Sequence, residues 1–245
     1  MKKLNTYIAL AALTTLVNAG TLDTLDIDKV TEVIPPVEVT TSYATDRVWR
    51  GSDLGQNEIV GSALTVFDMP ADTTLSLNTV YTNADSATSS NDETEITAIF
   101  SKSVADYLLS LSYTWYSEDF DQQGSGQAQE VGLSVSRDIG PVTLYLTQYF
   151  GVEGDNNQYS EIGAAYSSNF DVLPVELNFT GEVGYLAQNS DFTHIELCVS
   201  TNLPVVENII AQPFVAYNLQ FGESFVSDID SNDVFFGGVQ FKRTF

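Results

Sequence analysis

Positively charged residues are scarce in this sequence: nine lysines and arginines stand against 33 aspartates and glutamates, for a formal net charge of -24. A chain without a basic patch cannot displace counterions from phosphates, which excludes nucleic acid as a partner. Cysteine and histidine are scarcer still, with one of each. A disulfide framework and a Cys/His zinc site are therefore excluded, and we expect no cofactor.

Long apolar runs are also missing after residue 19, where nothing approaches the ~18 consecutive apolar residues that a membrane helix needs. Hydrophobic residues nevertheless make up 43% of the 245 residues, which is enough to build a folded domain. Any insertion of this part of the chain into a membrane must then occur as a β-barrel, because only a closed sheet satisfies its backbone in lipid without helices.

The N-terminus has the pattern of a cleaved export signal. Two lysines at positions 2 and 3 precede the uncharged, mostly apolar stretch 7–17, and Val17-Asn18-Ala19 supplies a cleavage site. We therefore predict a signal peptide over residues 1–19. Residues 20–36 are acidic, end in two prolines and are expected to form a leader, and residues 37–245 are expected to form the barrel.

From Val37 onward the dominant pattern is apolar/polar alternation in runs of about ten residues, which is typical of β-strands with two different faces. The predicted fold class is all-β: an up-and-down antiparallel transmembrane β-barrel of about twelve strands. The predicted strands cover residues 37–46, 57–67, 72–83, 94–103, 106–117, 127–137, 141–151, 158–168, 172–186, 192–202, 207–221 and 233–245.

The connectors between these runs alternate in length. Short, turn-like connectors are predicted at 68–71, 103–105, 138–140, 168–171 and 202–206, and longer, mostly acidic ones at 47–56, 83–93, 117–126, 152–157, near 187–190 and at 222–232. Short periplasmic turns and long outer loops are typical of outer-membrane barrels, whereas Greek-key crossings would disturb the alternation. The predicted location is the outer membrane of a Gram-negative bacterium.

The two faces of the strands predict the partners of the barrel wall. The apolar face should contact outer-membrane lipid and lipopolysaccharide, with aromatic girdles at both rims, and the small polar face should line the lumen. The chain ends in a strand whose last residue, Phe245, resembles the signal read by the outer-membrane assembly machinery. Arg243 departs from that signature, since an apolar residue would be usual there.

Charged residues within the strands should face the lumen, because a charge on the lipid face costs several kcal/mol. The residues predicted to line the lumen by this parity are Glu38, Glu95, Glu130, Glu161, Glu176, Glu182, Glu196, His194 and Lys242. Strand closure should also bring Glu38 and Lys242 into an ion pair. The excess of carboxylates over bases predicts that, among the small solutes of such a channel, cations are preferred to anions.

A second group of charged residues is predicted at the outer rim and in the loops: Arg47, Arg50, Glu118, Asp119 and Asp121. The acidic loop residues could bind Ca²⁺, or bridge through a divalent ion to lipopolysaccharide. They do not match the spacing of a calcium-binding loop, so the prediction is a solvated acidic loop without a metal.

The first strand carries a resemblance to a known family. Residues 42–51 (SYATDRVWRG), followed by Asp53-Leu54-Gly55, resemble the opening of the TorF family of outer-membrane porins. In that family a Ser-Tyr pair is followed by an aromatic-Arg-Gly at the end of the first strand, and Trp49-Arg50-Gly51 matches that pattern. The resemblance implies a small barrel that acts as a channel, and it implies no catalytic residues.

We therefore predict a small passive, cation-preferring channel without enzymatic activity. One alternative is a plugged barrel with a structural or adhesive role through its acidic loops. The other is a hydrolase embedded in the barrel that uses His194, although the residues two positions away, Phe192 and Glu196, supply no nucleophile.

Overall fold

The structure is a computed structural model, and Val37–Phe245 form one compact unit. The predicted signal peptide and most of the leader lie outside the residues that the structure describes, as do the acidic residues Glu118, Asp119 and Asp121. The described residues are 35–50, 52–85, 93–117, 129–152, 158–169, 175–187, 190–221 and 233–245.

The described part of the chain contains thirteen strands, in keeping with the period-two pattern. They are β1 (Val37–Trp49), β2 (Ser52–Met69), β3 (Thr73–Asp85), β4 (Glu93–Val104), β5 (Tyr107–Tyr116), β6 (Gln129–Ile139), β7 (Val142–Gly151), β8 (Gln158–Asn169), β9 (Glu176–Leu186), β10 (Asp191–Thr201), β11 (Leu203–Val206), β12 (Ile209–Gln220) and β13 (Val234–Thr244).

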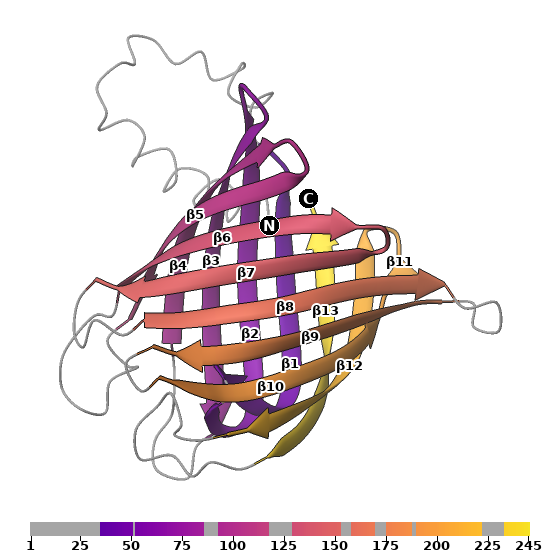
Figure 1. Ribbon diagram of the computed structural model, residues 1–245. Coiled ribbons are helices and arrows are strands. Elements are labelled where there is room, and N and C mark those ends of the chain that lie inside the picture. The colour runs from indigo at the N-terminus through magenta and orange to yellow at the C-terminus, as the bar shows by residue number, and fades with distance from the viewer. Residues whose placement is uncertain are drawn as a thin grey trace. The chain divides into compact units, whose positions relative to one another are not determined.

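Twelve of these strands form a closed antiparallel barrel, which confirms the predicted fold class and strand number. Each strand pairs with its neighbours along the chain, β10 pairs with β12, and β13 pairs with β1 to close the wall. In Figure 1, β1 to β4 lie on the far side of the barrel and β6 to β10 cross the near side. No helix in the described residues is long and apolar enough to cross a membrane.

The closing seam depends on a glycine. Gly238 on β13 lies opposite Ala44 on β1, and a Cβ atom at Gly238 would lie 2.0 Å from the Tyr43 carbonyl oxygen. Any larger residue would push the first and last barrel strands apart. At the edge of the seam, the Phe245 amide donates to the Val37 carbonyl at 3.0 Å.

Two predicted connectors are wrong. Residues 47–56 were expected to form a long loop, but β1 continues to Trp49 and β2 begins at Ser52, with a register shift between Arg47 and Val48. The shift interrupts the apolar/polar alternation at the end of β1, where the buried Arg47 lies. This end of the strand therefore has the sequence pattern of a loop. The strict alternation of connector lengths therefore fails at the first connector.

The second wrong connector is 202–206, which was expected to be a turn because of Pro204. It contains the short strand β11, which pairs with β12 through a turn in which Asn208 has a φ of 64°. Proline is tolerated in a strand at the edge of a sheet, and asparagine is one of the few residues that readily adopt a positive φ.

The two faces of the wall differ as the sequence pattern predicts. On β5, Leu109, Leu111 and Tyr113 are exposed, whereas the alternating residues Ser110 and Ser112 are half-buried and Thr114 is buried. Ser110 contacts Ser101, and Thr114 contacts Thr97, both on β4. The outer face is thus apolar, and the inner face is built mainly from small hydroxyl side chains.

Candidate functional site

The strand register shows which predicted residues share a face. Glu130 lies opposite Thr114, Glu161 opposite Thr147, and Glu182 opposite Glu196. Following the paired residues around the closed sheet places the remaining predicted strand residues on the same face: Glu38, Glu95, Glu176, His194 and Lys242. They belong to one side of the wall.

Arg50 shows that this side is the interior of the barrel. It lies just after β1, and it makes two parallel hydrogen bonds to Glu130 on β6, from Nη1 to Oε1 at 2.7 Å and from Nη2 to Oε2 at 2.6 Å. Because β1 and β6 are not neighbours in the sheet, the contact has to cross the interior between opposite walls. The Tyr116 hydroxyl donates to the same Glu130 carboxylate at 2.9 Å.

Aromatic rings surround the Arg50 guanidinium. Its Cζ atom lies 4.5 Å from the centre of the Trp49 ring and 4.7 Å from the centres of the Tyr149 and Tyr159 rings. At such distances a guanidinium is attracted to the negative faces of the rings, and more strongly when it is buried. Arg50 and Glu130 are both buried, so this pair is well shielded from solvent.

A second buried arginine lies on β1. The Arg47 Nη2 atom pairs with a carboxylate oxygen of Glu93 on β4, and its Nε lies 3.7 Å from Glu58 Oε1 on β2. Glu93 lies opposite Thr82 and Glu58 opposite Ala44, both on the inner face. The two arginines of β1 and its turn therefore hold carboxylates from three separate strands.

His194 lies in the same half of the barrel. Its Nε2 is 3.8 Å from Glu182 Oε1, and the Tyr145 hydroxyl donates to the other Glu182 oxygen at 2.9 Å. The Tyr159 ring, which also faces Arg50, stacks on the imidazole with 6.5 Å between ring centres and 9° between planes. Together we call Arg47, Arg50, Glu58, Glu93, Glu130, Glu182 and His194 the charged layer.

The structure places a hydroxyl group next to His194, which the sequence pattern did not reveal and which bears on the hydrolase alternative. A register shift between Phe192 and His194 turns Thr193 inward, and its Oγ1 lies 3.0 Å from His194 Nδ1. Both side chains are almost completely buried, with 2% and 1% of their surface exposed. A substrate cannot reach the Thr193 hydroxyl in this conformation, so the contact orients the imidazole.

The inner-face side chains are buried towards one end of the barrel and exposed towards the other. The charged layer lies towards the ends of the strands that carry the long connectors. Towards the short turns, the inner-face residues Val66, Leu108 and Ile210 are 39%, 44% and 40% exposed. The two arginines of the charged layer are therefore buried, whereas these inner-face side chains near the turns are accessible to solvent.

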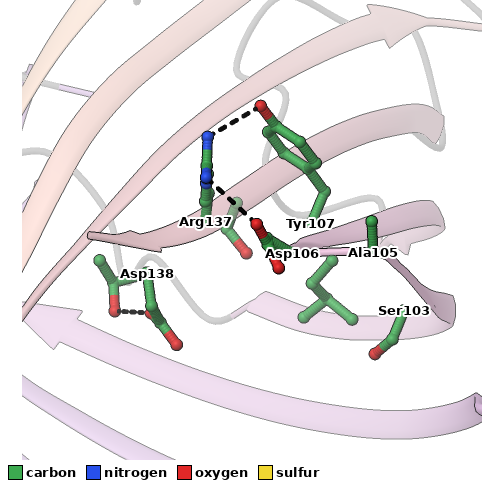
Figure 2. Close-up of a pocket in the computed structure, with 9 residues that line it drawn as sticks. Ser103, Ala105, Asp106, Tyr107, Arg137 and Asp138 are labelled. Atoms are coloured by element: carbon green, nitrogen blue, oxygen red, sulfur yellow. Dashed lines mark hydrogen bonds and ion pairs between the residues drawn. The ribbon is translucent and has the colours of Figure 1, made fainter. Parts of the chain in front are cut away.

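A recess at the turn end is a second candidate, shown in Figure 2. Its cavity volume is about 530 Å³, and its lining includes Ser103, Asp106, Tyr107, Arg137 and Asp138. The Arg137 guanidinium contacts the Asp106 carboxylate and the Tyr107 hydroxyl, each at 3.2 Å. These groups are exposed, and such an ion pair contributes about 0–1 kcal/mol. The recess therefore lacks the buried ion pairs that define the charged layer.

The predicted ion pair between Glu38 and Lys242 is wrong. The register places both residues on the inner face near the turn end, where Lys242 lies opposite Thr40 and Glu38 opposite Thr244. The ion pairs among the described residues do not include these two side chains. They are offset by two residues along the seam.

Several residues in and next to the charged layer were missed in the sequence. Glu58 stood at the beginning of a predicted strand, and Glu93 stood at the end of a predicted acidic loop, which concealed their inward direction. Tyr149 and Tyr159 could have been found, because strand parity places them on the inner face with Thr147 and Glu161. Both rings contact Arg50 because the wall curves, and nothing in the neighbouring sequence indicates that contact.

Substituting one partner of the Arg50–Glu130 pair should strongly destabilise the barrel. We expect Glu130→Leu to lower the free energy of unfolding by about 3–5 kcal/mol, because Arg50 keeps its charge when its buried partner is lost. The double substitution Arg50→Met/Glu130→Leu should recover most of the loss. Urea unfolding of the barrel in lipid vesicles measures both values, and equal losses in the single and double variants would contradict the burial of the pair.

No family model matches the chain, and no curated protein matches it. Solved structures share its fold. An outer membrane channel from Pseudomonas putida F1 has a TM-score of 0.57 at 11% identity, over 86% of this chain and 96% of that one. The NanC porin has a TM-score of 0.52 at 8% identity, over 84% and 98%. The KdgM porin, in complex with a disordered oligogalacturonate, has a TM-score of 0.50 at 12% identity, over 86% and 99%.

Proposed function

We propose that the protein is a small outer-membrane channel that prefers cations. The observation that carries the proposal is a closed barrel whose interior is crossed by a charged layer while its outside is apolar. The similarity to solved barrels supports the fold on which this function rests. Membership of the TorF family is part of the proposal, and it rests on residues 42–55.

The outer surface supports insertion into a membrane. Large apolar side chains are exposed on strand after strand, among them Ile96, Leu111, Leu133, Leu146 and Leu197. A soluble monomer rarely exposes a continuous apolar surface of more than a few hundred Å², whereas lipid covers such a band around an outer-membrane barrel. We place the short turns on the periplasmic side and the long loops outside.

The charge of the interior supports cation preference. The inner face of the loop half carries Arg47 and Arg50, against the carboxylates of Glu58, Glu93, Glu95, Glu130, Glu161, Glu182 and Glu196. The carboxylates outnumber the two guanidinium groups, and low-dielectric walls focus the resulting negative potential. Rings of acidic side chains give cation preference in other pores by the same physics.

A plugged barrel is the second candidate, and one observation favours it: the buried Arg50 side chain spans the interior to reach Glu130 on β6. Reconstituted vesicles separate the two functions. With an outward potassium gradient, vesicles containing the folded protein should develop an inside-negative potential, detected by a voltage-sensitive dye. Vesicles with folded protein that stay as tight as empty ones would support the plugged barrel.

The terminal residue should matter for assembly, because Phe245 ends the last strand and its backbone bonds to Val37 across the seam. We expect deletion of Phe245 to lower the yield of membrane-inserted, heat-modifiable protein several-fold, since both the recognition signal and a seam contact are lost. Electrophoresis of unheated membrane fractions measures the yield. Wild-type yields from the truncated gene would contradict an outer-membrane assembly signal at this position.

A further inference from the structure

The groups around the Arg50 guanidinium have the composition of a ligand site. Glu130 accepts two parallel hydrogen bonds from the edge of the guanidinium, and the rings of Tyr149 and Tyr159 face it. The Tyr116 hydroxyl orients the carboxylate at 2.9 Å. A fork of parallel hydrogen bonds and aromatic faces are the two features by which proteins recognise a flat organic cation.

The residues that surround the guanidinium lie on the barrel wall, whereas Arg50 itself lies in the turn between β1 and β2. Glu130, Tyr116, Tyr149 and Tyr159 lie on β6, β5, β7 and β8, which are consecutive paired strands. Arg50 comes from the opposite wall, and its φ of 48° is uncommon for a residue other than glycine. Such a conformation is strained and persists because the surrounding contacts hold it.

We infer that Glu130, Tyr116, Tyr149 and Tyr159 form a binding site for small cations of the guanidinium class, which Arg50 occupies from within the chain. A free cation of this class competes with Arg50 for the site. A side chain on a short tether has an effective concentration in the millimolar range, so free ligand needs comparable or higher concentrations to displace it. If the barrel conducts as proposed above, displacement also changes the ion path.

Binding is measured without any need for conductance. Saturation-transfer NMR on the folded, detergent-solubilised full chain, with methylguanidinium as the probe, gives an apparent Kd for each variant. We expect Arg50→Ala to bind methylguanidinium at least about tenfold more tightly than wild type, because the tethered competitor is gone. Methylammonium, which lacks the planar fork, should gain much less from the same substitution.

Two further variants make the test specific. Arg50→Ala/Glu130→Gln should lose the gained affinity, because the charged acceptor pair is removed. Arg137→Ala removes an arginine that also contacts a carboxylate and a tyrosine, but at the exposed turn end, and it should bind the probe like wild type.

Arg50→Lys protects the test against a folding failure of Arg50→Ala, because it keeps a positive charge near Glu130. It should also bind methylguanidinium more tightly than wild type, since an ammonium group cannot reproduce the fork. The inference is overturned if neither Arg50 variant gains affinity over wild type, or if the gain survives Glu130→Gln. Failure of the channel proposal would leave these binding results unchanged.

Discussion

Replacing Arg50 with alanine should raise the single-channel conductance several-fold above that of the wild-type barrel. The guanidinium crosses the interior from the end of β1 to Glu130 on β6, and the rings of Tyr149 and Tyr159 pack against it. Its removal opens the space between opposite walls. Recordings in planar bilayers at symmetric salt measure the step size directly.

Two controls separate this effect from a general loosening of the barrel. Arg50→Ala/Glu130→Ala removes both charges of the buried pair and should also conduct more than wild type. Arg137→Ala, at the exposed rim, should keep the wild-type step size. Wild-type conductance in the Arg50→Ala barrel, verified as folded by heat modifiability, would show that the ion path avoids this residue.

The second large effect concerns selectivity. The triple substitution Glu95→Gln, Glu176→Gln and Glu196→Gln should reduce cation preference, because it removes three inner-face charges and keeps similar side-chain shapes. The reversal potential in a salt gradient measures the change. Glu207→Gln, at an exposed turn position, is the matched control and should leave the reversal potential unchanged. An unchanged value in the triple variant would show that these carboxylates do not face the ion path.

Molar salt and acid should both reduce cation preference, as the triple substitution does. The screening length falls to about 3 Å in molar salt, so the negative potential of the interior reaches less far into the path. Acid protonates the carboxylates and removes their charge altogether. Selectivity that increased in molar salt or in acid would contradict an origin in these side chains.

The fold could be predicted because its signals are local. Alternation such as that of residues 107–115 marks a wall with an apolar side and a polar side, and a charged residue in a strand has to avoid lipid. The same parity argument placed Glu130, Glu161 and Glu182 on one face, which is the face that the register gives them. The alternation of apolar and polar residues along the chain is therefore enough to predict a two-faced β-sheet wall.

The charged layer could not be predicted because its contacts join distant parts of the chain. Arg50 and Glu130 are 80 positions apart and meet across the barrel, and nothing near either residue specifies the other. Register shifts added a second difficulty. The shift at Arg47 and Val48 concealed the end of β1, and the shift at Phe192 and His194 turned Thr193 inward. Such irregularities interrupt the period on which the sequence argument depends.

The most direct test of the central claim is the reversal potential of the wild-type protein in a planar bilayer with a tenfold potassium chloride gradient. The account predicts discrete current steps and a potential of the sign set by potassium movement, within the limit of about 59 mV for a perfectly selective monovalent path. A potential of the opposite sign would contradict cation preference. No current from a barrel verified as folded and inserted would contradict the channel itself.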